Sequence, residues 1–448
     1  MANSIETHNI SPPPAAAATE LTVPLSFLDI PWLHFHPIRR LLFYSHPCSN
    51  SDFFEIVIPK LKQSLSLTLK HYLPLSGNLI YPLNTSQKPI FRYSPGGSVS
   101  LTVTVSSNDF DELVGNHARD ADQFYHLVPE IPPVKNEPDY LTVPVLALRA
   151  TLFPGRGICI GIANHHSAGD ASSIFNFMKT WSSIAKHGEN DLPYLPIFDR
   201  SVINDPLGID NIYWKVIGSI PLKSSSFPLP TNRVRTTFTL RPGDIQRLKN
   251  LVLDEKPGLF QVSSFVVTVS YVWTCLVKSG DAVGEVVDSD AVEFLIFAAD
   301  ARSRVDPPVP ESYFGNCLAA GMAKVEHSWL VGEKGLASVA EVISEDIKNR
   351  LNKKGEVMKG AENLMSVMGE WRGMRGVGVA GSPKFDLCES DFGWGRARKL
   401  EIVSIDGESY SMSLCKCSDW DGGLEIGMSL PKERMEAFGA IFVQGLSD

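Results

Sequence analysis

The stretch from Gly157 to Trp181 constrains the fold most, because the spacing of its apolar residues changes from two positions to three or four. Isoleucine alternates with smaller residues from Ile158 to Ile162, which is typical of a buried β-strand. After Asp170, apolar side chains recur at helical spacing as far as Trp181. The stretch therefore predicts a strand, a short turn and an amphipathic helix, and it indicates a chain of the α/β class.

The turn reads Asn164-His165-His166-Ser167-Ala168-Gly169-Asp170. If the alternation of the strand continues, Asn164 and His166 share one face and His165 points the opposite way. His166 then lies beside a helix N-terminus, where the helix dipole disfavours an imidazolium and keeps the ring a neutral base. Asp170 has two interpretations, as the cap of the helix or as the orienting acid of a His-Asp pair, and we favour the cap.

The length and net charge of the chain limit the classes of function that it can have. A chain of 448 residues predicts two domains of roughly 200 residues each. The net charge of -9 comes from 50 acidic and 41 basic residues that are scattered along the chain without a basic stripe. A nucleic-acid partner is therefore not expected.

Neither secretion nor a membrane span is expected. Residues 1–20 lack a basic start followed by an apolar run, so they do not resemble a secretory signal. The window 260–277 is the most apolar, but Ser, Thr and Gln side chains interrupt it, which favours a buried helix. The seven cysteines show no paired zinc spacing and favour reduced thiols. We expect a cytoplasmic protein that does not bind a membrane.

Further elements follow from the same patterns. Prolines and broken periodicity between 187 and 230 indicate an interdomain connection. In the first half we expect a helix over 58–72 and a hairpin whose strands are 145–153 and 157–166. In the second half we expect a strand over 234–240, a helix over 242–253, a helix over 263–278 and a strand over 292–299.

Four segments together carry a family resemblance. The turn ends in His166-Ser167-Ala168-Gly169-Asp170, which fits an HxxxD motif, and residues 391–395 read DFGWG. Residues 313–317 read YFGNC, and residues 71–77 read HYLPLSG. In this order the segments resemble those of the plant BAHD acyl-CoA-dependent acyltransferases, in the branch that acylates anthocyanin, flavonoid and other phenolic glucosides. The resemblance runs from about Leu25 to the C-terminus.

The resemblance implies a monomer of two chloramphenicol-acetyltransferase-like α/β domains with a solvent channel at their interface. Residues 1–190 would form the N-terminal domain with HxxxD, 191–230 a crossover linker, and 231–448 the C-terminal domain with YFGNC and DFGWG. The implied activity is transfer of a malonyl group from malonyl-CoA to a sugar hydroxyl, the 6-hydroxyl of glucose, in a phenolic or flavonoid glucoside. The alternative is a hydroxycinnamoyl transferase that uses coumaroyl-CoA or caffeoyl-CoA on such glycosides.

The resemblance also assigns roles to residues. His166 would be the general base of a ternary-complex reaction without an acyl-enzyme. Asp170 would turn away from it and pair with Arg302 or Arg304. Asp391 is assigned as a catalytic residue, and the alternative is that it belongs to a structural loop around Gly393 and Gly395. Trp394 would form a wall of the channel or lie next to the oxyanion. CoA contacts are expected from Ser263, Ser264, Asp300, Arg302, Ser303, Arg304, Ser382, Pro383 and Lys384.

The donor and the competing functions stay open at this point. A malonyl carboxylate in the channel needs a cation, for which Lys179 is one candidate. A coumaroyl group would need an aromatic slot, which Trp32, Phe35 and Phe43 allow. A metallohydrolase that uses His165, His166 and Asp170 as ligands is disfavoured by the opposite faces of the histidines. A noncatalytic phenolic or sugar binder ranks lower still, because the base and DFGWG are both present. We expect acyl-CoA as cosubstrate and neither a metal nor a resident cofactor.

Overall fold

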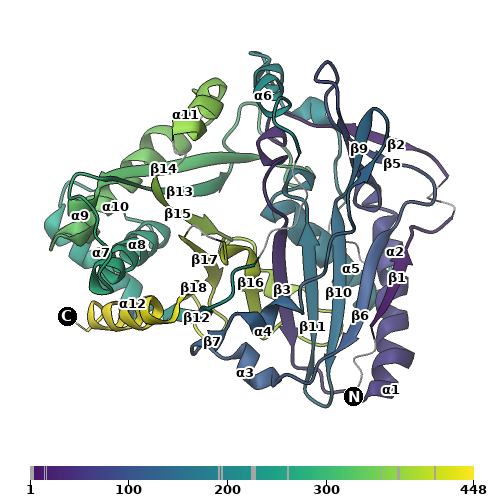
Figure 1. Ribbon diagram of the computed structural model, residues 1–448, viewed down its shortest axis with the longest axis horizontal. Helices are drawn as coiled ribbons and strands as arrows, with labels where there is room; N and C mark the ends of the chain where they lie inside the picture. Colours follow the sequence, from purple (N-terminus) through teal and green to yellow (C-terminus); the bar gives the residue numbers. More distant parts are fainter. Residues whose placement is uncertain are drawn as a thin grey trace.

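The computed structural model describes residues 5–14, 16, 18–189, 192, 195–222, 229–259, 262–353, 355–370, 374–407 and 410–447, the side chains of 367, 368 and 370 excepted. Pro193 and Pro228, which contributed to the expected linker, lie outside these ranges. Figure 1 shows two lobes side by side, one rich in strands and the other with a cluster of helices against a twisted sheet.

The first sheet has the strand order β1-β6-β10-β11-β3-β16, in which β6 and β10 are parallel and the other pairs are antiparallel. Its strands are β1 (Glu6–Ile10), β3 (Ile38–Tyr44), β6 (Val99–Val105), β10 (Leu146–Phe153), β11 (Gly157–Asn164) and β16 (Lys399–Ile402). The predicted hairpin is confirmed, with Phe153 opposite Gly157 across its turn.

Both faces of the first sheet are covered, and the alternation in β11 decides what each side chain contacts. Ile158, Ile160 and Ile162 belong to the main core with helices α2 (Ile58–Leu69) and α5 (Ala171–His187). Cys159 belongs instead to a smaller core under two short helices, α3 (Phe110–Val114) and α4 (Asp122–Tyr125). In Figure 1, α2 and α5 lie together behind the strands. The predicted helices over 58–72 and after Asp170 are therefore confirmed.

The second sheet has the order β14-β13-β15-β17-β18-β12-β7, with β13, β15 and β17 parallel to one another. Its strands are β7 (Arg119–Asp120), β12 (Arg233–Leu240), β13 (Val292–Asp300), β14 (Leu318–Glu326), β15 (Arg375–Ala380), β17 (Tyr410–Lys416) and β18 (Leu424–Pro431). The strands predicted over 234–240 and 292–299 are confirmed as β12 and β13.

The helical cluster packs beside the second sheet (Figure 1). Its helices are α7 (Pro242–Glu255), α8 (Ser264–Ala282), α9 (His327–Val331), α10 (Gly335–Asp346) and α12 (Lys432–Gln444). The helix predicted in the most apolar window is α8, and it is buried against α7, α10 and α12 as expected. Within the described ranges, no helix has the length and apolar character that a membrane crossing requires.

The third sheet has the order β2-β5-β4-β9-β8 and is antiparallel throughout. Its strands are β2 (Leu21–Pro24), β4 (Asn78–Pro82), β5 (Ile90–Tyr93), β8 (Lys135–Asn136) and β9 (Tyr140–Pro144). The remaining helical segments are α1 (Asn50–Asp52), α6 (Ile209–Ile217), α11 (Leu364–Glu370), η1 (Ile30–Trp32), η2 (Phe53–Val57), η3 (Leu73–Ser76), η4 (His166–Ala168), η5 (Arg200–Val202), η6 (Ile347–Leu351), η7 (Ala361–Asn363), η8 (Leu387–Glu389) and η9 (Val403–Ile405).

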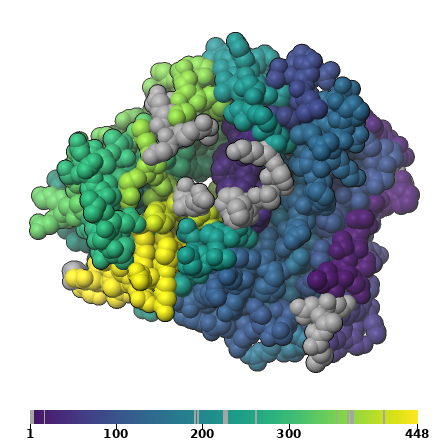
Figure 2. Space-filling view, in the orientation of Figure 1, coloured from purple at the N-terminus to yellow at the C-terminus, as the bar shows by residue number. Residues whose placement is uncertain are grey.

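The two halves of the chain exchange strands. From the second half, β16 pairs with β3 at the edge of the first sheet, while β7 of the first half pairs with β12 in the second sheet. The boundary expected near residue 230 therefore does not coincide with the limits of the sheets. On the face shown in Figure 2, the surface is hollowed where the halves meet, with purple N-terminal residues at the edge of the hollow.

Candidate active site

The turn after β11 presents the two histidines to different surroundings. β11 ends at Asn164, residues His166–Ala168 form the 3-10 turn η4, and α5 starts at Ala171. His165 Nδ1 accepts the backbone N–H of Ser167 at 3.3 Å and forms a hydrogen bond with its hydroxyl at 2.8 Å. His165 therefore caps the turn from its buried side, which is a structural use of this histidine.

His166 lies between aromatic rings. The indole of Trp32 stacks on the imidazole with centroids 3.9 Å apart and an interplanar angle of 8°, and the ring of Phe35 meets it edge-on at 5.4 Å. Nδ1 of His166 is buried without a hydrogen-bond partner among the described residues, although the residue as a whole is only partly buried. Desolvation by burial, with the nearby charge of Arg40 adding to it, lowers the pKa of His166 to about 3. The ring is therefore neutral at physiological pH, and burial rather than the helix dipole is the main cause.

Asp170 is hydrogen-bonded to residues other than His166. It is the N-cap of α5 and accepts the backbone N–H of Ser173 at 3.0 Å. Its two carboxylate oxygens accept from the guanidinium of Arg302 at 2.8 and 3.1 Å, and Oδ2 also accepts the backbone N–H of Cys317 at 3.0 Å. Burial opposes the charge on Arg302, but Asp170 and Asp300 outweigh it and raise the pKa of the guanidinium. The carboxylate thus ties the start of α5 to the second half of the chain.

The YFGNC segment holds the same turn from the opposite side. The side-chain amide of Asn316 donates to the carbonyl oxygens of His166 at 3.0 Å and Ser167 at 3.2 Å. It also donates to Oδ1 of the buried Asp29 at 3.1 Å, which accepts the Asn316 backbone N–H at 2.9 Å as well. Gly315 exchanges backbone hydrogen bonds with the hydroxyl of Ser173. The motif therefore fixes the backbone that carries His166.

The structure does not bring Asp391 to His166. Its Oδ1 accepts the backbone N–H groups of Gly393 and Gly395, both at 2.8 Å, and its Oδ2 pairs with Lys186 at 2.7 Å. Lys186 is in the last turn of α5, and a helix rises about 1.5 Å per residue, so that turn is on the order of 20 Å from the first. Of the two interpretations of Asp391, the geometry favours the structural loop over the catalytic role.

The aromatic residues of DFGWG pack within the first half. Phe392 meets Trp181 of α5 edge-on at 4.9 Å, and Trp394 stacks on His46 at 5.4 Å and on Phe392 at 5.1 Å. Gly393 and Gly395 have φ angles of +94° and +83°, which L side chains rarely adopt, so glycine is required at both. The contacts of Trp394 place it in this aromatic cluster and not beside His166.

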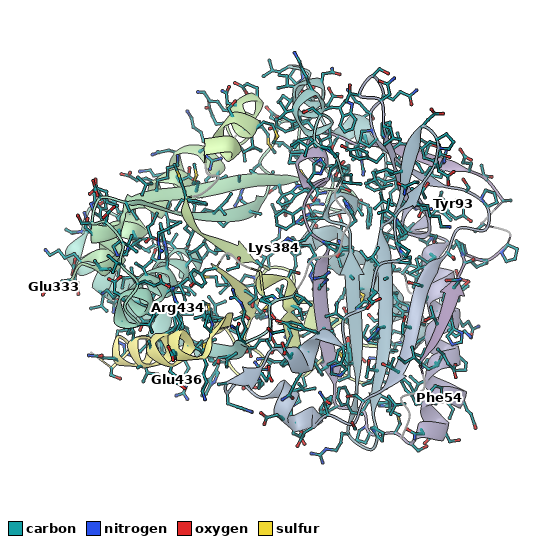
Figure 3. The ribbon with its side chains drawn as sticks, viewed as in Figure 1. Phe54, Tyr93, Glu333, Lys384, Arg434 and Glu436 are labelled. Atoms are coloured by element: carbon teal, nitrogen blue, oxygen red, sulfur yellow. The ribbon has the colours of Figure 1, made fainter. Side chains whose placement is uncertain are left out.

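The segments expected to contact CoA converge at one edge of the second sheet. β13 and β15 are parallel, so Asp300–Arg304 and Ser382–Lys384, which follow them, leave at the same edge. Lys384 Nζ pairs with Asp300 at 2.8 Å and joins the two segments. The N-terminus of α8, capped by Ser263, reaches the same strands because Phe265 packs on Phe297 at 5.0 Å. In Figure 3, Lys384 lies near the centre of the molecule, between the lobes.

A small, partly open pocket lies between these segments and the first turn of α5. It is lined by Arg40, Ala171, Gly381, Ser382, Phe385, Asp386, Leu387, Leu400, Ile402, Cys415 and Lys416. Lys179, the candidate partner for a malonyl carboxylate, is not in that lining; it pairs with Glu389 at 3.2 Å. Arg40 is a lining residue that our sequence reasoning missed. Its signal was the pair Arg39-Arg40 in an apolar strand, because alternation must turn one of the two toward each face.

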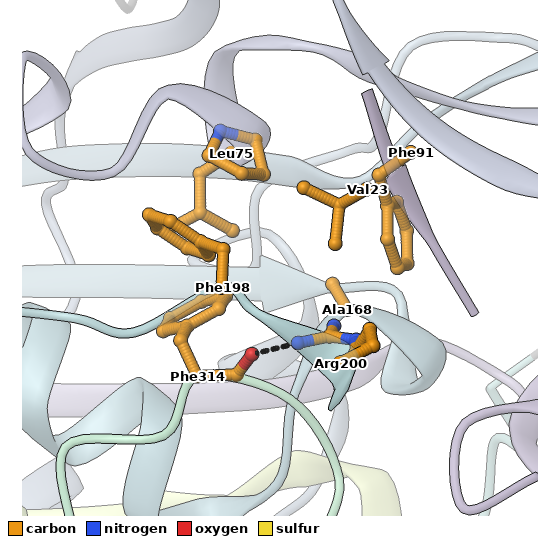
Figure 4. Close-up of a pocket in the computed structure, with 8 residues that line it drawn as sticks. Val23, Leu75, Phe91, Ala168, Phe198, Arg200 and Phe314 are labelled. Atoms are coloured by element: carbon orange, nitrogen blue, oxygen red, sulfur yellow. Dashed lines mark hydrogen bonds between the residues drawn. The ribbon is translucent and has the colours of Figure 1, made fainter. Parts of the chain in front are cut away.

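A second small pocket is lined by Ala168 of the turn (Figure 4). Val23, Leu75, Phe91, Phe198 and Phe314 give it apolar walls. Its cation, Arg200, donates to the Phe314 carbonyl and lies 3.4 Å from Oδ2 of Asp29. The side chains that line this pocket pack under Ala168. None of the residues drawn in Figure 4 has a charged group that is free to bind a ligand.

Two of the three residues of the metallohydrolase alternative, His165 and Asp170, have other partners. His165 Nδ1 is used by Ser167, and both oxygens of Asp170 are used by Arg302. Across the described ranges, no cluster of three or more His, Cys, Asp or Glu side chains is arranged to hold a metal ion.

The fold and the turn define a class: proteins of the acyltransferase fold, built from two mixed α/β halves with a neutral histidine at their junction. Vinorine synthase has this fold, with a TM-score of 0.71, 20% identity and 98% of each chain covered. So does TRI101 of F. sporotrichioides in complex with coenzyme A and T-2, with a TM-score of 0.66, 16% identity and coverage of 94% of this chain and 97% of that one. At these identities the likeness shows the fold.

The chain belongs to the Transferase family, that of the BAHD acyltransferases, whose sequence pattern matches residues 4–443. It is 54% identical to the malonyl-coenzyme:anthocyanin 5-O-glucoside-6'''-O-malonyltransferase of Salvia splendens, over 98% of this chain and 94% of that protein. It is 45% identical to phenolic glucoside malonyltransferase 1 of Nicotiana tabacum over all of both chains. It is 34% identical to a coumaroyl-CoA:anthocyanidin 3-O-glucoside-6''-O-coumaroyltransferase of Arabidopsis thaliana, over 99% of this chain and 97% of that protein.

Proposed function

We propose that this protein transfers a malonyl group from malonyl-CoA to a sugar hydroxyl of a phenolic or flavonoid glucoside, the 6-hydroxyl of glucose being the position we expect. The observation that carries the proposal is the neutral, partly exposed His166, in a turn that joins a cavity at the CoA-side segments to an aromatic surface. The malonyltransferases of Salvia splendens and Nicotiana tabacum, at 54% and 45% identity, are more similar to this chain than the coumaroyl transferase at 34%, which supports malonyl as the donor group.

His166 acts as the general base in the reaction we propose. The sugar hydroxyl gives its proton to the imidazole as its oxygen attacks the thioester carbonyl. The tetrahedral oxyanion then collapses, the carbon–sulfur bond breaks, and the imidazolium returns the proton to the CoA thiolate. A ring whose pKa is lowered to about 3 in the free protein is unprotonated at neutral pH, and once protonated it returns the proton readily. No residue needs to carry the acyl group.

The acceptor lies against the aromatic residues beside His166. Trp32 stacks directly on the imidazole, and Phe35 is 41% exposed next to it. A planar phenol or flavonoid offers the face that an indole or phenyl ring prefers. Its glucose would then reach the base. Phe43, the third candidate for an aromatic slot, is fully buried under α3 and α4, so it offers no surface to a substrate.

The other site residues support the base and the donor. We assign Asp170 and Arg302 to the structure of the turn, and Asp391, Gly393, Trp394 and Gly395 to the loop at the far end of α5. Ser263, Ser264, Asp300, Ser303, Arg304, Ser382, Pro383 and Lys384 are the proposed CoA contacts. Their convergence at one sheet edge supports this assignment.

We also propose that the protein works as a monomer in the cytosol, with residues 1–190 and 231–448 as its two domains and 191–230 as the crossover. Its seven cysteines are free thiols, which fits a reducing compartment. The junction between the halves would then be the channel through which donor and acceptor meet.

A donor panel tests the function. The purified protein is incubated with a phenolic glucoside, such as 4-nitrophenyl β-glucoside, and with malonyl-CoA, acetyl-CoA or coumaroyl-CoA, and products are identified by mass and by NMR of the sugar. We expect a malonyl ester at the 6-position as the main product. Efficient coumaroyl transfer without malonyl transfer would overturn the proposal in favour of the hydroxycinnamoyl alternative.

A further inference from the structure

Arg40 is a partly buried arginine near the start of a largely apolar strand. It lies in β3, where it pairs with Ile162 of β11 on one side and with Ile402 of β16 on the other. Side chains alternate along a strand, so Arg40 shares its face with Leu42 and Tyr44, whose side chains belong to the main core. The guanidinium thus extends from the strand next to the edge of the first sheet, on the side of α5, where its neighbours along the strand are apolar.

The guanidinium of Arg40 has little to balance its charge. Its Nη1 donates to Oδ1 of Asn164 at 2.9 Å, and no described carboxylate forms an ion pair with it. Other buried arginines differ in this respect, since Arg119 pairs with Glu401 at 2.7 Å and Arg302 with Asp170 at 2.8 Å. Burial lowers the pKa of Arg40 to about 10. A guanidinium has five N–H donors in a planar fork, so one hydrogen bond leaves room for a bidentate carboxylate.

The pocket that Arg40 lines lies beside the His166 turn, and the charge of Arg40 acts on His166. Ala171, which lines it, is the first residue of the helix that follows the His166 turn, and Ser382 belongs to the proposed CoA contacts. An acyl thioester that reaches His166 from the CoA side therefore passes this wall. Leu400 and Ile402 supply apolar surface there, which strengthens any ion pair formed inside.

The other charges of this cavity are already used or exposed. Asp386 pairs with Arg396 at 2.5 Å and accepts the Cys388 backbone N–H. Lys416 lines the cavity but is exposed to solvent, so its charge is hydrated. Arg40 is then the cation best placed to gain from an incoming carboxylate, because it lines the pocket, is partly buried and forms no ion pair with a described carboxylate.

We propose that Arg40 binds the free carboxylate of the malonyl donor through a bidentate ion pair and so selects malonyl-CoA over uncharged acyl-CoAs. This inference rests on the proposed function, in which the donor is malonyl-CoA. An acetyl group would leave the guanidinium without its partner, and a hydroxycinnamoyl group would place an aromatic ring where the carboxylate binds.

The test compares donor selectivity across variants of one strand. Arg40→Gln removes the charge, Arg40→Lys keeps it without the planar fork, and Arg39→Gln makes the same change at the adjacent residue on the opposite face of β3. For each protein, kcat/KM is measured with malonyl-CoA and with acetyl-CoA on 4-nitrophenyl β-glucoside. We expect Arg40→Gln to lower the malonyl:acetyl ratio about 30- to 150-fold, as the loss of a hydrogen-bonded charge pair predicts. We expect Arg40→Lys to keep part of the preference, and Arg39→Gln to leave the ratio within about twofold.

A binding measurement separates selection from damage to the turn. By calorimetry with the folded proteins, the wild type should bind malonyl-CoA more tightly than acetyl-CoA, and Arg40→Gln should remove that difference while still binding acetyl-CoA. An equal loss with both donors would show that Arg40 only supports Asn164 and the turn, and would overturn the inference while malonyl transfer by the wild type stands. A wild type that does not transfer malonyl at all would overturn the proposed function and this inference with it. A change of ratio in Lys416→Gln but not in Arg40→Gln would assign the carboxylate to Lys416.

Discussion

At the scale of single residues, the consecutive histidines show how position within one turn decides chemistry. His165 has its Nδ1 committed to Ser167, whereas the Nδ1 of His166 has no partner among the described residues and its ring is covered by Trp32. Burial lowers the pKa of both rings, to about 4 for His165 and about 3 for His166. Only His166 combines a neutral ring with access to the surfaces on which donor and acceptor would lie.

The low pKa of His166 predicts an unusual pH profile. The base is active when neutral, and its pKa in the free protein is about 3 instead of the ordinary 6.5, so activity should not fall as pH drops through 6.5. We expect the specificity constant for malonyl transfer to stay within about twofold between pH 7.5 and 5.5, because the ring remains neutral over that range. Initial rates at constant ionic strength and constant acceptor concentration check this. An acid limb with an apparent pKa near 6.5 would show that the base is exposed and solvated.

At the scale of elements, the strand, turn and helix around His166 could be predicted from sequence because their apolar periods are local and long. The hairpin of β10 and β11 and the helices α5, α7 and α8 lie where those periods indicated. The apolar period of a segment does not indicate which distant segment will pack against the turn. Asn316 donates to His166 across 150 positions of sequence, and Asp29 joins it across 287. Arg40 and Asp29 were missed because a charged residue in a largely apolar segment equally fits a structural ion pair.

The ion pair between Asp170 and Arg302 joins the start of α5 to the segment after β13. Asp170→Asn and Arg302→Met should each lower the free energy of unfolding by about 3–5 kcal/mol, because the first removes the nearest carboxylate of the buried Arg302 and the second leaves Asp170 without its cation. The double variant should lose less than the sum, since no charge remains unpaired. Urea denaturation of the four proteins measures this. Additive losses would mean that the two residues do not act on each other.

The loop that contains Asp391 gives a second prediction for an element. Burial alone would raise the pKa of Asp391, but Lys186 and the N–H groups of Gly393 and Gly395 hold it below its ordinary value. Asp391→Ala should therefore destabilise the protein by about 1–2 kcal/mol, as loss of a capping side chain does, while the turnover number stays within about threefold. Lys186→Met, the control, removes only a half-exposed ion pair and should cost less than about 1 kcal/mol. If a folded Asp391→Ala protein turned over malonyl-CoA at least a hundredfold more slowly than the wild type, the catalytic assignment of Asp391 would be restored.

At the scale of the whole molecule, the exchange of strands makes the two halves one structure. A buried cluster marks the exchange: Glu401 of β16 accepts from Arg119 of β7 at 2.7 Å and from Arg235 of β12 at 2.8 Å. Each half thus supplies charges that the other must satisfy. Such long-range pairing of very short strands could not be predicted from composition or period, since β7 has two residues and β16 four. The halves meet where the cavities and His166 lie, so their relative position sets the geometry of the site.

Glu401 predicts how stability depends on pH. Burial alone would raise its pKa, but Arg119, Arg235 and Lys399 lower it to about 2 from an ordinary 4.5. A carboxylate whose pKa is lower in the folded state stabilises it fully above about pH 4.5 and progressively less as pH falls toward 2. Glu401→Gln should therefore lower the free energy of unfolding by about 3–5 kcal/mol at pH 7. The difference in this free energy between the variant and the wild type should become smaller below pH 4.5. A difference in the free energy of unfolding that stays constant from pH 7 to pH 3.5 would contradict the ion-pair account.

The central claim is that the imidazole of His166 removes the acceptor proton. The most direct measurement is the turnover number for malonyl transfer by His166→Ala, with His187→Ala, the same change at the exposed far end of α5, as control. Circular dichroism and malonyl-CoA binding verify that both variants are folded. We predict that His166→Ala loses activity by about 10²- to 10⁴-fold, as removal of a general base does, while His187→Ala stays within twofold of the wild type. A folded His166→Ala protein that keeps more than a tenth of wild-type turnover would contradict the account.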